Sequence, residues 1–270
     1  MDIHTVTSFR PARTRADLAL APGEAFLAGG TWLMSEPQPD TTGFVDLTTL
    51  GWPDLEVSGD GLRIGATCTI ARLVAWARAE APEGWPAVAA IPDAANALLA
   101  SFKIWNTATV GGNVARSFAA AAMVALTSGL DGVAEIWTPG GERRIPVADL
   151  VTGNGTNSLA VGEVIRAIEL PAAALASRLV LRKIALAEYG RSGAVVTGRV
   201  DADGAAVFGI TAATQSPTVL RFADLPDAPT LRGAVEAASG YYTDPLGSAD
   251  WRRGVSAVLA ERVRTELAAA

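Results

Sequence analysis

The chain has 270 residues, half of them hydrophobic, and a net charge of −6. This length and apolar content predict two or three folded units, each with its own buried core. The acidic balance and the scattered Lys and Arg residues argue against nucleic acid as a partner, because phosphate binding needs clustered positive charge.

Cysteine and histidine are nearly absent from the chain. Cys68 is the only cysteine and His4 the only histidine. The chain therefore forms no internal disulfide. It also cannot supply an iron–sulfur cluster, a zinc–thiolate site or a multi-histidine metal site, since each needs several of these ligands. We expect no metal site, and we expect Cys68 to be a small buried hydrophobe.

The chain carries no obvious signal for export or membrane insertion. Its first residues lack a basic stretch followed by an apolar one, which is the pattern of a signal peptide. No run approaches the roughly 20 consecutive apolar residues that a spanning helix needs. We therefore expect a cytoplasmic protein without a membrane span.

Short strands and helices alternate in the first half of the chain. A helix is predicted from a Thr69 cap to about residue 81, because Ile70, Leu73, Val74 and Ala77 recur at helical spacing. Apolar runs bounded by Gly or Pro predict strands at 25–28, 44–47 and 62–66. Further helices are predicted at 14–20, at 92–101 and, as one continuous element, at about 115–128.

Strands dominate the second half. Residues 134–138 and 144–147 flank a Pro-Gly-Gly-Glu turn and predict a hairpin, and 164–170 form another strand. Beyond residue 175 an antiparallel region is predicted, with strands at 193–200 and 205–213 joined through an Asp-Gly turn. A long helix is predicted at 251–267.

Two glycine-rich turns are the candidate binding elements. The first is Ala28, Gly29, Gly30 and Thr31, directly after an apolar strand. Glycine permits positive φ and close approach of a ligand to the backbone, and successive N–H groups in such a turn bind anions. On its own, the turn is better explained as the end of a strand.

The second turn comprises Thr109, Val110, Gly111, Gly112 and Asn113. Its glycines are expected just ahead of the helix predicted at 115–128, where free N–H groups and the helix dipole favour phosphate. Asn113 is expected either to cap that helix or to bind the ligand. Neither turn fits the Rossmann or P-loop pattern, so the two turns would have to grip one extended ligand between them.

With these motifs in order, the chain resembles the FAD-binding medium subunit of molybdenum hydroxylases, the xanthine dehydrogenase and aerobic carbon monoxide dehydrogenase family. The two glycine turns, the opening Phe-Arg-Pro and the Ile-Gly-Ala element with its threonines carry the resemblance. So do Gly-Glu-Val-Ile at 162–165, Leu-Arg-Lys-Ile at 181–184 and Asp-Trp-Arg-Arg at 250–253. The likeness extends over nearly the whole chain.

The resemblance implies an α+β fold in two domains. Residues 1–174 would form an FAD-binding domain of two α/β subdomains (PCMH-like), at about 1–56 and 57–174. Residues 175–270 would form a C-terminal domain with an antiparallel sheet and helices. FAD would lie extended between the subdomains, with its pyrophosphate gripped by both turns.

The resemblance also implies a set of cofactor-binding residues and no catalytic residue. Arg191 and Tyr189 lie in a loop that could reach the flavin ring, but they are not part of this set. The implied set is Leu27, Ala28, Gly29, Gly30, Thr31, Trp32, Leu33, Ala108, Thr109, Gly111, Gly112, Asn113, Val164 and Lys183.

The implied function is electron transfer within a heterotrimer or a dimer of heterotrimers. A large subunit would carry molybdopterin and oxidise the organic substrate, and a small subunit would carry two [2Fe–2S] clusters. Electrons would pass from those clusters to FAD in this flavoprotein, and then to an external acceptor. The scarcity of cysteine agrees, because the clusters must lie in another chain.

Three positions depart from the family pattern. Trp32 replaces a short polar residue, Trp105 replaces an arginine, and Ala122 stands where relatives place an aspartate that binds FAD. Either Trp side chain could stack on the ligand or simply pack in a core or an interface. Two alternatives therefore stay open: a flavin-free scaffold subunit of the same complex, and a stand-alone flavin oxidoreductase.

Overall fold

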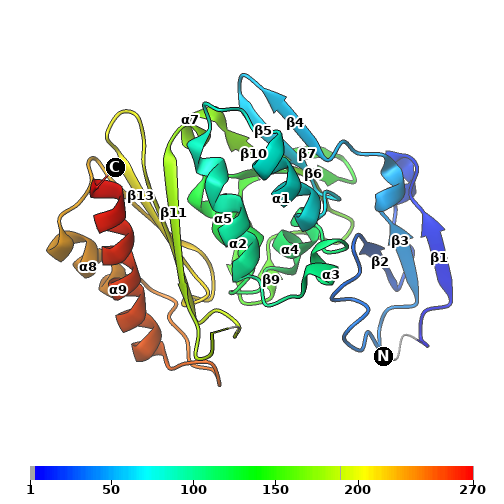
Figure 1. Cartoon of the computed structure of the whole chain (residues 1–270). Helices are drawn as coiled ribbons and strands as arrows, with labels where there is room; N and C mark the ends of the chain where they lie inside the picture. The colour runs from blue at the N-terminus through cyan, green and yellow to red at the C-terminus, as the bar shows by residue number, and fades with distance from the viewer. Residues whose placement is uncertain (1–3, 189, 270) are drawn as a thin grey trace.

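Three larger β-sheets, accompanied by a two-stranded ribbon, follow one another along the described chain in the computed structural model (Figure 1). The structure describes residues 4–188 and 190–269. Helices and sheets are combined in every part beyond the N-terminal sheet, and this confirms the predicted α+β class. In Figure 1 the N-terminal sheet lies at the right, the central unit in the middle and the C-terminal sheet at the left.

The N-terminal sheet is small and parallel. Its strand order is β1-β3-β2, so the strand between the two outer ones is the last in sequence. A modest core that includes Leu18, Val45 and Leu47 lies beneath it. The elements are β1 (Ser8–Pro11), the 3-10 helix η1 (Arg15–Leu18), β2 (Glu24–Leu27), β3 (Gly43–Asp46) and η2 (Thr48–Leu50).

The central sheet has five antiparallel strands in the order β4-β5-β10-β6-β7. The β6–β7 hairpin confirms the prediction from its Pro-Gly turn. β4 spans the position near residue 56 where we expected a subdomain boundary, and it pairs with β5. The strands are β4 (Leu55–Ser58), β5 (Gly61–Gly65), β6 (Val133–Thr138), β7 (Gly141–Pro146) and β10 (Val164–Pro171).

Helices pack on this sheet around the largest core of the molecule. As predicted, Thr69 caps the first of them, and its hydroxyl accepts a hydrogen bond from the N–H of Arg72 at 3.1 Å. The helices are α1 (Ile70–Ala79), η3 (Pro86–Ala90), α2 (Ile91–Ala97), α3 (Phe102–Trp105), α4 (Val110–Arg116), α5 (Ala122–Gly129), α6 (Val147–Leu150) and α7 (Ala172–Leu175), with a two-stranded ribbon of β8 (Val151–Gly153) and β9 (Thr156–Asn157).

The prediction of one helix at about 115–128 is wrong. The chain forms α4 and α5 with a break between them, and the break begins at Ser117, whose φ is 55°. The glycines of the second turn consequently lie inside α4 rather than ahead of a helix. The helix predicted at 92–101 also ends early, at Ala97.

The C-terminal sheet is antiparallel in sequence order, and this confirms the two strands predicted there. Helices α8 and α9 pack on one face of it, and α5 of the central unit packs on the other. The elements are β11 (Arg178–Ile184), β12 (Ala194–Val200), β13 (Ala206–Thr211), β14 (Thr218–Phe222), α8 (Ala228–Ala237) and α9 (Ala249–Ala268).

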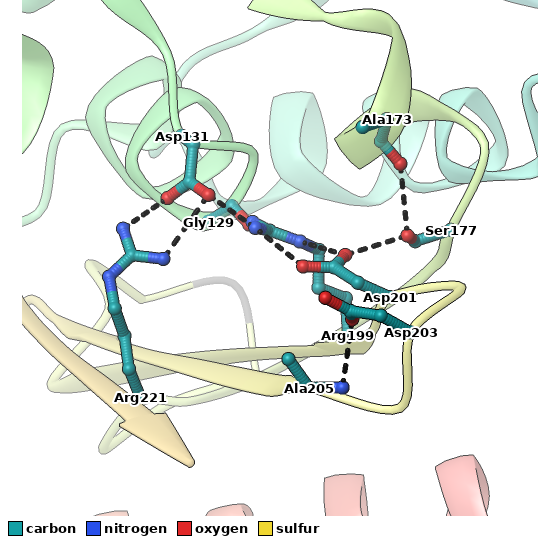
Figure 2. A network of polar contacts seen from close by, with 9 residues as sticks. All are labelled: Gly129, Asp131, Ala173, Ser177, Arg199, Asp201, Asp203, Ala205 and Arg221. Atoms are coloured by element: carbon teal, nitrogen blue, oxygen red, sulfur yellow. Dashed lines mark hydrogen bonds and ion pairs between the residues drawn. The ribbon is translucent and has the colours of Figure 1, made fainter. Parts of the chain in front are cut away.

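A buried arginine joins the central unit to the C-terminal sheet (Figure 2). Arg199 on β12 donates to the carbonyl of Gly129 at 2.5 Å and to Asp201 at 2.7 Å, and it also pairs with Asp131. Arg221 on β14 reaches the other oxygen of Asp131 at 2.6 Å. Since the Arg199 side chain is only 2% exposed, its charge depends on these carboxylates, and the network fixes the two units against each other.

Candidate functional site

A cleft of about 620 Å³ lies between the N-terminal sheet and the central helices. This volume is within the roughly 300–1,000 Å³ that ligand sites typically have. Both glycine turns contribute to its lining, from residues 28–33, 108–109 and 111–113. Leu98, Leu99 and Ile104 add an apolar wall on the central side.

The first turn begins where β2 ends. Gly30 has a φ of 66°, which a residue with a side chain rarely adopts. The chain then enters a short helical turn, in which the N–H of Met34 donates to the carbonyl of Gly30 at 2.8 Å. Within residues 4–188 and 190–269, the N–H groups of Gly30, Thr31 and Trp32 donate to no protein acceptor. Such a run of free N–H groups next to a left-handed residue is a ready site for an anion.

The first glycine turn touches the segment that leads directly into the second. A Cβ built on Gly29 would lie 1.9 Å from the carbonyl oxygen of Thr107 and 3.2 Å from the Cα of Ala108. Only a residue without a side chain can bring the two segments this close. The sequence predicted that both turns face one ligand, and the structure brings them to one cleft.

The second turn uses its own N–H groups inside the protein, contrary to our expectation of free donors. The N–H of Val110 donates to Cys68 at 2.9 Å, and that of Gly111 to Ala66 at 3.0 Å. The N–H of Gly112 donates to the hydroxyl of Thr109, the N-cap of α4, at 3.0 Å. The backbone of this turn therefore shapes the cleft, but its first N–H groups are already satisfied.

Asn113 has a structural partner that the sequence did not reveal. Its side-chain oxygen accepts a hydrogen bond from the N–H of Met123 at 2.9 Å, in the first turn of α5. Asn113 therefore caps a helix N-terminus, which is one of the two roles that we expected for it. The helix that it caps is α5, however, and not α4, in which Asn113 itself lies. Asn113 also lines the cleft.

An arginine that the sequence analysis did not single out also lines the cleft. The guanidinium carbon of Arg116 lies 3.8 Å from the ring centroid of Trp32 and 4.1 Å from that of Phe118. The two rings meet edge to face at 6.3 Å. Burial lowers the pKa of Arg116, because the charged guanidinium loses contact with water.

The charges around the cleft favour an anionic ligand. Arg191 also lines it, with its guanidinium carbon 5.4 Å from the Phe118 ring. Glu163 is the acidic residue of the lining, and it is paired with Arg143 at 2.6 Å. The hydrogen bond with Arg143 holds the pKa of Glu163 below its usual value. Tyr189, considered together with Arg191, lies outside the described residues.

All but two of the predicted cofactor residues line the cleft. The first exception is Leu27 at the end of β2, whose side chain is buried beside the turn. The second is Lys183, whose ammonium donates to the carbonyl of Asn96 at 3.2 Å instead. The residues brought together are Ala28, Gly29, Gly30, Thr31, Trp32, Leu33, Ala108, Thr109, Gly111, Gly112, Asn113 and Val164.

Of the three positions that depart from the family pattern, only Trp32 lines the cleft. Trp105 is half-buried and packs against the central core. Ala122 is 1% exposed as the first residue of α5. Packing therefore sets the places of Trp105 and Ala122, and Trp32 is the departure that the cleft contains.

The break between α4 and α5 explains why Arg116 and Phe118 escaped the sequence analysis. On one continuous helix, residues two apart point about 200° from each other, at about 100° per residue. They could then not share a site. The left-handed conformation of Ser117 turns the chain so that both side chains reach the cleft. The only sequence signal was a polar and an aromatic residue interrupting an alanine-rich run.

Within the described part of the chain, no group of three or more His, Cys, Asp or Glu side chains is arranged to hold a metal ion. Cys68 is fully buried, and burial raises the pKa of its thiol to about 12, so it behaves as the predicted small hydrophobe. No helix among the described residues is both long and apolar enough to cross a membrane.

A family model described as the FAD binding domain in molybdopterin dehydrogenase matches residues 8–173, more than half of the chain. This span contains both glycine turns and every residue that lines the cleft except Arg191. A comparison with curated protein sequences finds no match.

Solved structures share the fold along almost the whole chain. A chain of quinoline 2-oxidoreductase from Pseudomonas putida 86 is 22% identical, with a TM-score of 0.79, 97% of this chain covered and 96% of that one. A chain of the reconstituted CO dehydrogenase from Oligotropha carboxidovorans is 22% identical, with a TM-score of 0.81 and coverages of 96% and 98%. A chain of carbon monoxide dehydrogenase from Hydrogenophaga pseudoflava is 18% identical, with a TM-score of 0.78 and coverages of 95% and 95%. At these identities the likeness establishes the fold.

Proposed function

Because the chain belongs to the family of FAD binding domains in molybdopterin dehydrogenases, we propose that it is the electron-transfer flavoprotein subunit of a heterotrimeric molybdenum hydroxylase. Family membership makes FAD its cofactor and places it among oxidoreductases. The proposal adds its role. Electrons arrive from [2Fe–2S] clusters of a small partner subunit, and an external acceptor removes them.

The cleft that both glycine turns line is the observation that carries this proposal. Its free N–H groups at Gly30, Thr31 and Trp32 suit a phosphate group. Arg116 and Arg191 supply positive charge at the same cleft. Its apolar walls suit flat aromatic rings, which are mainly held by dispersion and burial. These features fit both ends of a flavin dinucleotide.

The flavin supplies the redox chemistry when it is bound, and the chain supplies binding and tuning. We propose that the lining residues of the two turns hold the dinucleotide, with Val164 on the central sheet adding an apolar contact. Leu27 and Lys183 are left out of this set, since neither lines the cleft. The cleft between residues 8–46 and the central unit supports an N-terminal subdomain separate from the central one. We propose a division at 1–56, 57–174 and 175–270, with its first boundary inside β4.

The proposal of an iron–sulfur partner rests on what this chain cannot hold. A [2Fe–2S] cluster needs several thiolate ligands, and Cys68 is a single buried cysteine. We propose a small [2Fe–2S] subunit and a large molybdopterin subunit as partners, in a cytoplasmic heterotrimer or a dimer of heterotrimers. The substrate is then oxidised on the large subunit, away from this chain.

The test begins with the chain purified together with the subunits that accompany it. A flavin absorption spectrum, about one FAD released per chain on denaturation, and two copurifying partners are expected. Rapid mixing of the dithionite-reduced small subunit with the FAD-loaded chain should then bleach the flavin band.

Two other results would each identify a different protein. A colourless chain that still copurifies with two partners is a scaffold subunit without flavin. A flavin-containing chain that runs as a lone monomer and turns over unaided is a stand-alone flavin oxidoreductase. Either result overturns the proposal.

A further inference from the structure

Arg116 is held in the cleft by two aromatic rings. Its guanidinium carbon lies 3.8 Å from the Trp32 ring centroid and 4.1 Å from that of Phe118. A planar guanidinium stacks well on an aromatic face, and the contact strengthens when water is excluded. The stack fixes the orientation of a side chain that would otherwise have many rotamers.

No carboxylate balances this charge. Among residues 4–188 and 190–269, Arg116 forms no ion pair, and its Nε is buried without a hydrogen-bond partner. Its one hydrogen bond is long, 3.4 Å from Nη1 to the carbonyl of Gly155. Buried Arg199 is paired with two aspartates and buried Arg252 with Asp244. Arg166 resembles Arg116, since it stacks on Trp52 and Trp137 and forms no ion pair within the described residues, but it does not line the cleft. A partly desolvated cation without a counter-ion is costly, and in the cleft a ligand can supply the anion.

The backbone around Arg116 is anchored from both sides. Ser117 has a φ of 55°, and its carbonyl accepts a hydrogen bond from the N–H of Gly155 at 2.8 Å. Asn154 accepts from the N–H of Ala119 at 3.0 Å, and Asn157 donates to Ala115 at 2.7 Å. The β8–β9 ribbon thus holds both ends of the segment that carries Arg116. The guanidinium is prepared for a ligand before the ligand binds.

Building on the proposed FAD-binding function, we propose that Arg116 is a further cofactor-binding residue that pairs with the pyrophosphate of FAD, and that Trp32 positions it. Trp32 belongs to the turn with free N–H groups, so a guanidinium stacked on its ring lies beside that turn. The second turn has no first-turn N–H group to spare. Arg116 therefore supplies, from a side chain, the positive partner that the backbone of the second turn does not.

This assignment gives the Trp at position 32 a function. Its aromatic face is occupied by Arg116, so the indole acts by orienting a cation. A guanidinium can donate two parallel hydrogen bonds to phosphate oxygens, which an ammonium cannot do in the same geometry. The pocket would then prefer flavins that carry a pyrophosphate over those that do not.

The test compares FAD with riboflavin, which has no phosphate, on flavin-free protein from the purified complex. Arg116→Gln should raise the Kd for FAD by about 10- to 100-fold, the loss of one charged hydrogen-bonding partner. The Kd for riboflavin should stay within about twofold, at the level of a neutral surface change. The salt dependence of FAD binding should weaken in the same variant, because a charge contact to phosphate is gone.

Two further variants separate charge from positioning. Arg116→Lys should recover part of the FAD affinity, and Trp32→Leu should weaken FAD binding in the wild-type background only. Combined with Arg116→Gln, Trp32→Leu should add little, since its effect passes through Arg116. The matched control is Arg15→Gln, which removes the same charge. Arg15 also stacks on an aromatic ring, that of Trp137 at 4.8 Å, but it lies outside the cleft.

The possible failures are distinguishable. If the unaltered protein binds no FAD, the proposed function falls and this assignment falls with it. If the unaltered protein binds FAD and Arg116→Gln binds it as tightly or more tightly, only the Arg116 assignment is refuted. The stacked side chains of Arg116, Trp32 and Phe118 then only fill space in the cleft. If riboflavin affinity falls as much as FAD affinity, Arg116 contacts the flavin ring rather than the pyrophosphate.

Discussion

Adding one methyl group at Gly29 should separate the two glycine turns and release FAD. The new Cβ would lie 1.9 Å from the carbonyl oxygen of Thr107, whereas ordinary contacts begin at 3.4 Å. Both atoms belong to backbone or are fixed to it, so the turns must move apart by about 1.5 Å. Overpacking of this kind costs about 1–3 kcal/mol. A fall of several degrees in Tm should accompany it.

Cofactor binding should suffer more than stability. A shift of this size takes N–H donors out of hydrogen-bonding distance of a phosphate group. Losing a single charge-assisted hydrogen bond is worth about 1.5–3 kcal/mol, so Gly29→Ala should raise the Kd for FAD at least about 10-fold. Fluorescence titration of flavin-free protein measures the Kd, and thermal unfolding of the same samples measures Tm.

Gly254→Ala is the matched control. Gly254 lies exposed in α9 with open space at its Cβ position. The same chemical change there should stabilise the helix by about 0.5–1 kcal/mol and leave FAD affinity unchanged. The reasoning is refuted if Gly29→Ala binds FAD with the wild-type Kd while folding normally, because the close approach of the turns would then be irrelevant to the cofactor.

Three other predictions concern stability and reactivity. Asp131→Asn should lower the free energy of unfolding, measured with denaturant, by about 1–3 kcal/mol, because buried Arg199 loses one of its two carboxylate partners. The control Asp250→Asn, at an exposed position, should change it by no more than about 0.5 kcal/mol. Hydrogen bonds, chiefly from Arg10, hold the pKa of Glu24 at about 2 instead of 4.5. The stability from this carboxylate is thus complete above about pH 4.5 and is lost as pH falls toward 2, so the stability gap to Glu24→Gln should shrink over that window. Cys68 should resist iodoacetamide in the native fold at about pH 8 and react fully in urea; rapid native labelling would contradict its burial.

Local signals were sufficient for most of the fold. The strand before the first glycine turn, the β6–β7 hairpin and the β12–β13 pair are each marked by an apolar run and a turn residue with a distinct backbone need. In the last case Gly204 has a φ of 92°. The long α9 has a Ser248 cap and apolar positions at helical spacing. These elements are specified within a few residues of sequence, so sequence reasoning finds them.

The break between α4 and α5 is not specified locally. The alanine-rich stretch after Ser117 favours a continuous helix by propensity alone. Distant contacts decide otherwise: the side chain of Asn154 accepts from Ala119, and that of Asn113 caps α5 through Met123. Tertiary hydrogen bonds have overridden propensity there. For that reason the stacked arginine, which depends on the break, could not be foreseen.

The two glycine turns have different roles in the structure. In the first, Gly30 takes a left-handed conformation, and the N–H groups that follow it are free for a ligand. In the second, a Cβ on Gly111 would lie 2.4 Å from that of Ala66, so this glycine is required for packing α4 against the neighbouring strand end. Its N–H also bonds to Ala66. The first turn therefore presents hydrogen-bond donors, and the second forms one wall of the cleft. The positive charge that the second turn lacks is available from Arg116 at the far end of α4. A two-sided grip on a pyrophosphate thus does not require two equivalent turns, since a backbone on one side and a held side chain on the other present the same complement of donors.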